Sequence, residues 1–262
     1  MSAPPLFHLT RGQAPLFVSF PHSGTYLPPD LAARLTPLAL TLPDTDWHVP
    51  KLYPFLDALG ASRIEATHSR YVVDVNRPPD DKELYAGQKK TRLVPTDTFK
   101  GEPLYRDGEA PEPDEIVARR RFWQPYHDAL AQELSRLKAI HGAVILWDAH
   151  SIASVLPTLF EGRLPDLNLG TFDGKSCDKD IADAALAAAQ QSGFNAVLNA
   201  RFKGGHITRH YGDRKKGVNA IQLEMAQTIY MDEDPPFTYR PDRAAKVTTA
   251  IRAMIAAALE AL

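Results

Sequence analysis

Cysteine is almost absent from the sequence: its 262 residues include one, Cys177, so the chain cannot form an internal disulfide. A single cysteine fits a reducing compartment, and the cytoplasm is the expected location. No apolar run approaches the roughly 20 residues that a membrane-spanning helix requires, and residues 1–11 lack the pattern of a secretory signal. The formal net charge of −2 provides no broad basic surface. Neither a membrane nor a nucleic acid is therefore an expected partner.

Several catalytic signatures are also missing. The sequence contains no His-Glu-x-x-His zinc motif, no Gly-x-Ser-x-Gly nucleophile pattern and no Walker-type or dinucleotide glycine pattern. Nucleotide binding and acyl-enzyme chemistry on serine therefore rank low. Cys177 has no obvious base beside it, which favours a thiol without a catalytic role.

Strand-like and helix-like segments alternate along the whole chain, which predicts one α/β domain over residues 1–262 with a mixed, mainly parallel sheet and helices on both faces. A polar stretch rich in proline, glycine and aspartate at about 80–114 is interpreted as a long loop or lid. We expect strands at 16–20, 70–76, 143–147, 194–198 and 219–225, and helices at 46–60, 116–140, 178–191 and 241–262.

Two histidines follow predicted strands and are the first candidates for a metal site. His22 comes after the strand at 16–20 and His150 after the strand at 143–147, and each precedes a serine. Because open α/β sheets place their chemistry outside the carboxyl ends of their strands, we expect the two imidazoles to meet at one sheet edge. The alternative is that both are ordinary loop histidines. Zinc in hydrolases usually takes three ligands of this kind and leaves a fourth position for water.

The third ligand is less defined by the sequence. The stretch at 44–48 offers Asp44, Asp46 and His48, although Asp44 could instead cap the helix expected at 46–60. Asp148 lies two residues before His150 and would share its face of the strand, where it could orient that histidine.

Glu224 ends an apolar strand, and a glutamate among apolar residues requires a reason. One reason is a general base that activates water and passes the proton to the leaving amine. The alternative is a buried ion pair with Arg209 or Arg214.

Cationic residues suited to a carboxylate occur in two further segments. Alternation along the strand expected at 70–76 places Arg70, Asp74 and Asn76 on one face, and Arg77 follows at its end. Two guanidinium groups near a cleft suit carboxylate recognition, although Arg70 and Asp74 could instead pair with each other. The glycine-bounded segment 203–212 is interpreted as a flexible loop that carries Arg209.

Taken together and in order, these motifs resemble the N-formylglutamate amidohydrolase family over about residues 16–232. The matching segments are Phe20-Pro21-His22-Ser23-Gly24, Ser69-Arg70-Tyr71-Val72-Val73-Asp74-Val75-Asn76-Arg77-Pro78, Trp147-Asp148-Ala149-His150-Ser151, Gly204-Gly205-His206-Ile207-Thr208-Arg209-His210-Tyr211-Gly212 and Gln222-Leu223-Glu224-Met225. The family is similar in fold to zinc carboxypeptidases.

The resemblance implies His22 and His150 as zinc ligands, Asn76 and Arg77 as the carboxylate-binding pair, and Glu224 as the catalytic glutamate. Zinc carboxypeptidases carry a ligand glutamate three residues after the first histidine, and here that position is Thr25. We therefore take Asp46 as the acidic ligand, with Asp44 and His48 as alternatives. His206 stands where the family pattern suggests tyrosine.

The implied activity is zinc-dependent hydrolysis of N-formyl-L-glutamate to L-glutamate and formate, a step of histidine degradation. Arg70, Asn76, Arg77 and Arg209 would hold the two carboxylates of this small dicarboxylate substrate. The alternatives are a deacylase or peptidase that acts on another N-acyl amino acid, and a non-enzymatic binder of dicarboxylates. The sequence leaves open whether the chain is a monomer or a homo-oligomer.

Overall fold

A seven-stranded mixed sheet lies at the centre of the structure, a computed structural model that describes residues 3–82 and 91–262. The strand order is β1-β3-β2-β4-β7-β5-β6. β1 and β5 run antiparallel to their neighbours β3 and β7, and the other adjacent pairs are parallel, which confirms the predicted type of sheet. The strands are β1 (Phe7–Thr10), β2 (Leu16–Phe20), β3 (Ser62–Ala66), β4 (Val144–Ile152), β5 (Leu167–Gly170), β6 (Ala196–Leu198) and β7 (Val218–Ala226).

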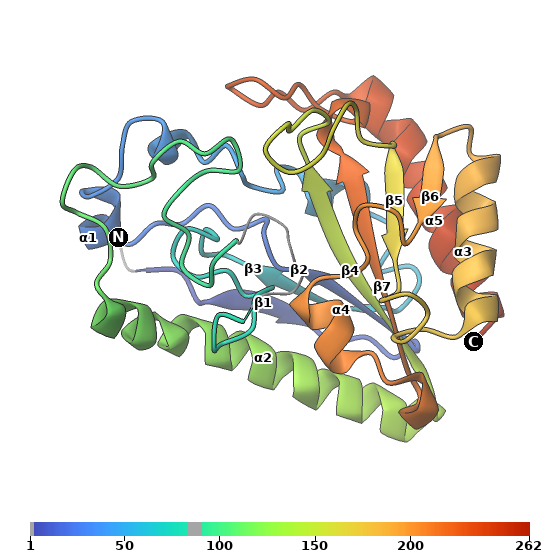
Figure 1. Cartoon of the computed structure of the whole chain (residues 1–262). Coiled ribbons are helices and arrows are strands. Elements are labelled where there is room, and N and C mark those ends of the chain that lie inside the picture. The colour runs from blue at the N-terminus through green and yellow to red at the C-terminus, as the bar shows by residue number, and fades with distance from the viewer. Residues whose placement is uncertain (1–2, 83–90) are drawn as a thin grey trace.

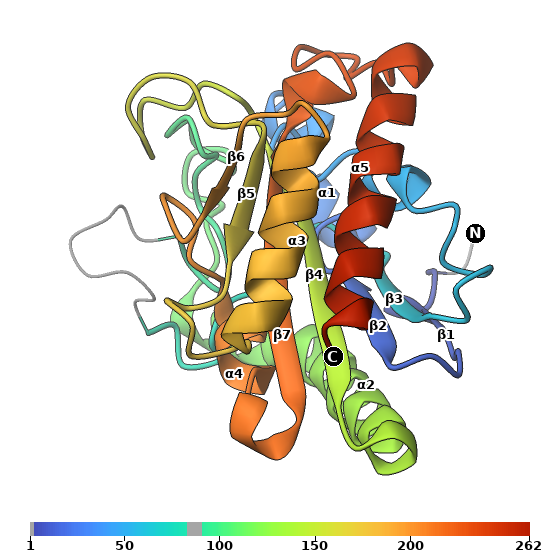
Figure 2. The same cartoon turned by 90° about the vertical axis from the view of Figure 1, so that its right-hand side faces the viewer.

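Helices cover both faces of this sheet. The long α2 crosses one face, and α3 and α5 pack side by side on the other (Figures 1 and 2). In the described part of the chain, no helix is both long and apolar enough to cross a membrane. The α-helices are α1 (Pro29–Ala32), α2 (Pro113–His141), α3 (Lys179–Gln191), α4 (His206–Tyr211) and α5 (Pro241–Glu260), and the short 3-10 helices are η1 (Ala39–Thr41), η2 (Val49–Leu52), η3 (Arg214–Lys216) and η4 (Gln227–Ile229).

Alternation along the central strands divides the core into two layers. In β2, Leu16 and Val18 pack into the cluster that contains α5, whereas Phe17 packs into the cluster that contains α2. All nine residues of β4 are buried, as expected for a strand covered on both faces.

The helices expected at 116–140, 178–191 and 241–262 are confirmed as α2, α3 and α5. Gly142 ends α2 with a positive φ of 79°, which glycine adopts without steric cost. Pro241 begins α5 in the first turn, where its missing N–H has no helical partner to lose.

Two predicted elements are wrong. The helix expected at 46–60 is a single 3-10 turn, Val49–Leu52, followed by turns, because Pro50 and Pro54 remove backbone donors within it. The strand expected at 70–76 is a series of turns. Its backbone bonds locally: Val72 N donates to Ser69 O, and Asn76 N donates to the Asp74 side chain.

The glycine-bounded segment at 203–212 is also different from the prediction of a flexible loop, because it contains α4. Residues 91–112 form turns and isolated bridges, as a loop does, whereas residues 83–90 of the predicted loop or lid lie outside the described residues. β1, β3 and β5 were not predicted from the sequence.

Candidate metal centre

The carboxyl ends of three adjacent parallel strands bring the main candidate residues together. His22 lies two residues beyond β2, His150 lies near the end of β4, and Glu224 lies near the end of β7. β4 and β7 pair in a register that sets His150 directly opposite Glu224. Val144 and Leu146 of β4 and Val218 and Ala220 of β7 pack into the cluster that contains α2. The polar residues Asp148, His150, Gln222 and Glu224 follow them at the same alternation.

A loop hydrogen bond brings Asp46 to the same place. The backbone N of Asp46 donates to the carbonyl O of His22 at 3.0 Å, and Gln227 Nε2 donates to the carbonyl O of Thr45 at 3.0 Å. These bonds fix the segment over the end of β2. The Asp46 carboxylate is therefore positioned by loop contacts, and not by the helix that the sequence suggested.

Three potential ligand atoms form a small buried triangle. His150 Nδ1 lies 3.2 Å from His22 Nδ1 and 3.2 Å from Asp46 Oδ2, and His22 Nδ1 lies 3.7 Å from Asp46 Oδ2. A tetrahedral zinc ion with bonds of about 2.0–2.1 Å separates its ligands by roughly 3.3 Å. The separations in this structure therefore fit three ligands around one small divalent cation.

A carboxylate lies on the far side of each imidazole. His22 Nε2 is 2.7 Å from Asp74 Oδ1, and His150 Nε2 is 2.9 Å from Asp148 Oδ2. Because a carboxylate accepts and cannot donate, a proton on each Nε2 would leave each Nδ1 free to bind a cation. Carboxylate–histidine pairs of this type orient metal ligands. Two imidazole nitrogens and a carboxylate oxygen form a donor set that a divalent cation satisfies.

The electrostatic environment gives the carboxylates of Asp46 and Glu224 very different pKa values. Burial alone would raise the pKa of Asp46, but hydrogen bonds from His150 and His22 lower it to about 2. Burial, together with the charges of Asp46 and Asp148, raises the pKa of Glu224 to about 8 against the opposing charges of His150 and Arg70. Asp46 is thus anionic, as a ligand must be, while Glu224 is the more basic group, as a proton acceptor must be.

These residues line one cavity of about 80 Å³. Arg70 lies in its wall, where Nη2 donates to Asp74 Oδ2 at 2.5 Å, so the alternative of an Arg70–Asp74 pair holds alongside a place at the cavity. The lining residues that could contact a ligand through polar or charged groups are His22, Asp46, Arg70, Asn76, Arg77, Thr91, His150, Ser151, Arg201, Gly205, Gln222 and Glu224. Arg201 was missed in the sequence, because it follows a short strand and belongs to no motif.

Asn76 and Arg77 are held at the cavity by α2. Trp123 Nε1 donates to the carbonyl O of Arg77 at 2.9 Å, and His127 Nε2 lies 2.7 Å from the carbonyl O of Val75. Trp123 and His127 lie one helical turn apart on α2. They therefore hold the backbone on either side of Asn76 by hydrogen bonds. Gly205 allows the close approach of α4, because an added Cβ would lie 2.4 Å from Asn76 Nδ2.

Other candidates lie elsewhere. Arg209 is not among the residues that line this cavity: its Nε donates to Gly204 O at 2.7 Å, and its guanidinium lies 4.5 Å over the Phe172 ring. His48 Nε2 lies 2.8 Å from the Phe237 carbonyl O. His206 stacks near His210 on α4.

Asp44 is buried beside the triangle and is not a helix cap. It accepts hydrogen bonds from Tyr71 OH and from Phe99 N. Burial raises the pKa of Asp44 to about 6. Of Asp46 and its alternatives Asp44 and His48, Asp46 is the residue whose carboxylate lies beside both His22 and His150.

Known proteins match the chain over nearly its full length. Residues 14–231 match the family model described as N-formylglutamate amidohydrolase. The chain is 54% identical over 252 residues to N-formylglutamate deformylase of Pseudomonas aeruginosa, covering 94% of this chain and 92% of that protein. It is 50% identical over 258 residues to N-formylglutamate deformylase of Pseudomonas putida, covering 97% and 94%.

A solved structure supports the fold. The crystal structure of N-formylglutamate amidohydrolase from Ralstonia eutropha JMP134 matches with a TM-score of 0.84 at 24% sequence identity, covering 97% of this chain and 98% of that chain. The sheet order and the two helical layers described above are therefore those of a known α/β architecture.

Proposed function

The chain belongs to the N-formylglutamate amidohydrolase family, and from this we propose that it hydrolyses the formamide bond of N-formyl-L-glutamate to L-glutamate and formate with one bound Zn²⁺. The observation that carries the proposal is the triangle of His22 Nδ1, Asp46 Oδ2 and His150 Nδ1, with Glu224 opposite His150 in the adjacent strand. Zn²⁺ held there would polarise the formyl carbonyl and lower the pKa of water towards about 7.

Glu224 supplies the proton transfers in this proposal. Its carboxylate takes a proton from the attacking water as the water oxygen bonds to the formyl carbon. It then returns that proton to the amide nitrogen as the C–N bond breaks, which releases formate and the free amine. Gln222 Nε2 donates to Glu224 Oε2 at 3.1 Å and so orients the carboxylate.

The substrate carboxylates would bind to the cationic part of the same cavity. We assign this role to Arg70, Asn76 and Arg77, and we add Arg201 because it lines the cavity. Guanidinium groups suit this task because they bind carboxylates in a bidentate manner. Arg209 does not line the cavity, so its role in binding a substrate carboxylate stays a prediction from the sequence.

Metal removal tests the proposal. Purified protein is treated with a chelator, assayed for formate release from N-formyl-L-glutamate, and assayed again after Zn²⁺ is restored. We expect activity to fall to background and to return with the ion. Full turnover by the metal-free protein would reject the proposal, and binding of glutamate without any turnover would favour a non-enzymatic binder.

Metal analysis of the protein as purified identifies the ion that is loaded. Because the same ligands accept other divalent ions, reconstitution with Mn²⁺, Co²⁺ and Zn²⁺ in parallel shows which ion supports the highest rate.

A further inference from the structure

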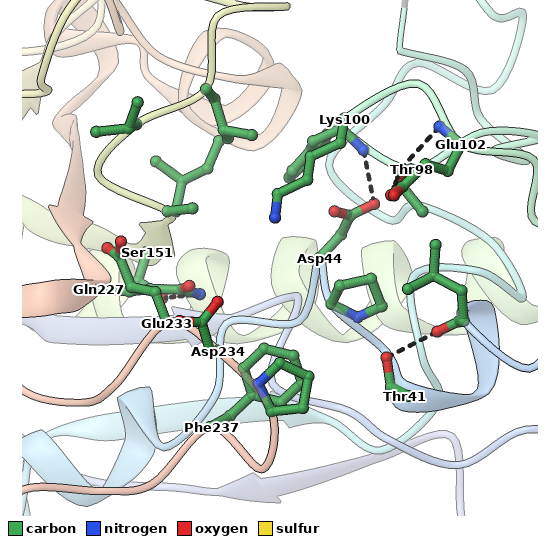
Figure 3. Close-up of a pocket in the computed structure, with 18 residues that line it drawn as sticks. Thr41, Asp44, Thr98, Lys100, Glu102, Ser151, Gln227, Glu233, Asp234 and Phe237 are labelled. Carbon is green, nitrogen blue, oxygen red and sulfur yellow. Dashed lines mark hydrogen bonds between the residues drawn. The ribbon is translucent and has the colours of Figure 1, made fainter.

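A second cavity of about 210 Å³ adjoins the metal cavity. Figure 3 shows its walls, with Asp44 and Ser151 on opposite sides and the side chain of Lys100 extending between them. It is larger than the cavity of about 80 Å³ that contains the candidate ligands, yet it contains none of them. Its role is therefore not explained by the metal centre itself.

Three residues line both cavities and form the partition between them: Phe99, Ser151 and Ile152. Ser151 and Ile152 belong to β4 and are fixed by the sheet. Phe99 belongs to the loop at 91–112, is half-buried, and is held through its backbone, since its N donates to Asp44 Oδ2 and its O accepts from Thr158 Oγ1. The Phe99 side chain is thus the one part of the partition that comes from outside the sheet.

The wall of the second cavity is part apolar and part polar, and Thr98, Ser151 and Gln227 are among its buried polar residues. Ile152, Leu156 and Phe237 are each at most 5% exposed, whereas Lys100 and Asp234 are exposed at the rim. Asp44 also lines the wall, but its Oδ2 already accepts two hydrogen bonds. The apolar part of the wall, made by Ile152, Leu156 and Phe237, suits a short alkyl group.

The distribution of cations indicates which part of a substrate would enter. Arg70, Arg77 and Arg201 line the metal cavity, and Lys100 is the one cation among the described residues that line the second cavity. The two carboxylates of an N-acyl glutamate would therefore stay in the metal cavity. The substituent on the acyl carbon, which is a hydrogen in formyl and a methyl group in acetyl, would then point toward the partition and the second cavity.

We propose that Phe99 sets the acyl-size limit of this enzyme, and that the cavity behind it accepts a short alkyl chain of the acyl group when the Phe99 ring is removed. This inference rests on the proposed hydrolysis at the metal centre. Formyl carries a hydrogen where acetyl carries a methyl group, so a closed partition at this point distinguishes the two. One methylene group in a closed apolar pocket changes kcat/KM by about 10- to 200-fold.

The test compares wild type, Phe99→Ala and Phe99→Leu on N-formyl-, N-acetyl- and N-propionyl-L-glutamate. The readout is the acetyl-to-formyl ratio of kcat/KM, because a general loss of activity cancels in a ratio. We expect Phe99→Ala to raise this ratio by about 10- to 200-fold and Phe99→Leu to raise it less. A change within twofold, in a variant that still hydrolyses the formyl substrate, would overturn the proposal.

Phe202 provides the matched control, because it is a half-buried aromatic residue that lines the metal cavity but not the second one. Phe202→Ala should leave the ratio within twofold of wild type, and an equal rise in Phe202→Ala would overturn the assignment to Phe99. A second series varies the amine side with N-formyl-L-aspartate and N-formyl-L-2-aminoadipate. A gain by Phe99→Ala on this series alone would also overturn it.

Failure of the underlying function has a separate signature. If metal-loaded wild type releases no formate from N-formyl-L-glutamate, the proposed function fails. If wild type is active and Phe99→Ala keeps the wild-type ratio, the function holds and the acyl-size inference fails.

Discussion

Replacing Asp74 by asparagine removes one negative charge and little volume from the support of the candidate metal centre. Asp74 is fully buried and contacts three groups: His22 Nε2 at 2.7 Å, Arg70 Nη2 at 2.5 Å and the backbone N of Asn76 at 2.9 Å. Burial would raise the pKa of Asp74, but Arg70 and His22 hold it well below its usual value. The carboxylate is therefore ionised in the folded protein.

The Asp74→Asn change has two expected effects. Loss of one partner from a buried ion pair costs about 3–5 kcal/mol in the free energy of unfolding. The lower end applies here, because Asp44 and Asp46 also stabilise the charge on Arg70. At about 2–4 °C per kcal/mol, a loss of about 3 kcal/mol lowers the Tm by about 6–12 °C. Metal affinity should fall about 10- to 100-fold, since the carboxylate that orients His22 is lost.

Asp148→Asn is the matched control. Asp148 lies 2.9 Å from His150 Nε2 on the opposite imidazole, and among the described residues no arginine pairs with it. This variant should also weaken metal binding, yet lower the Tm of the metal-free protein less than Asp74→Asn does, because the His150 imidazole that it leaves behind still contacts Asp46. Thermal unfolding of the metal-free proteins measures the Tm, and zinc competition against a chelator measures the metal affinity. Equal Tm values for Asp74→Asn and wild type would refute the reasoning.

Three further variants test other contacts. Glu224→Gln should lower kcat by about 10²–10⁴-fold while zinc content stays the same, and a near-normal rate would remove Glu224 from its proposed role. Trp123→Phe deletes the donor to the Arg77 carbonyl, worth about 1 kcal/mol, so KM should rise about fivefold with kcat within twofold; an unchanged KM would contradict the positioning role. Burial lowers the pKa of His127 from 6.5 to about 3, so the unfolded chain takes up this proton first and stability is lost as pH falls from about 6.5 towards 3. His127→Gln should flatten that part of an acid-unfolding curve followed by circular dichroism, and an identical curve would argue against a buried neutral imidazole.

The sequence predicted the parts of the fold whose burial pattern is complete within one segment. The strands that became β2, β4 and β7 are mainly apolar and buried at every residue, and the apolar residues of α2 recur at helical spacing. β3 was missed because its buried and half-buried residues alternate in a polar stretch, and its assignment depends on pairing with β1 and β2. The helix expected at 46–60 has the right spacing of apolar residues, but its prolines outweigh that spacing.

The same distinction applies to the site. His22, His150 and Glu224 could be grouped in advance, because parallel strands bring their carboxyl ends to one sheet edge. Asp46 could be chosen only among neighbours, since its position depends on one loop hydrogen bond to His22. Arg201 reaches the cavity from a loop with no periodic pattern. The cytoplasmic location and the roles of Arg209 and His206 stay predictions.

The pairing of β4 with β7 limits how this protein can change in length over evolution. Nine consecutive residue pairs tie the two strands together, from Val144 with Val218 to Ile152 with Ala226. A one-residue insertion or deletion in either strand would put Leu223 or Met225 opposite His150 and turn Glu224 to the other face. Natural variants should therefore gain or lose residues in the connecting loops, whereas the spacing within each of these two strands should be invariant.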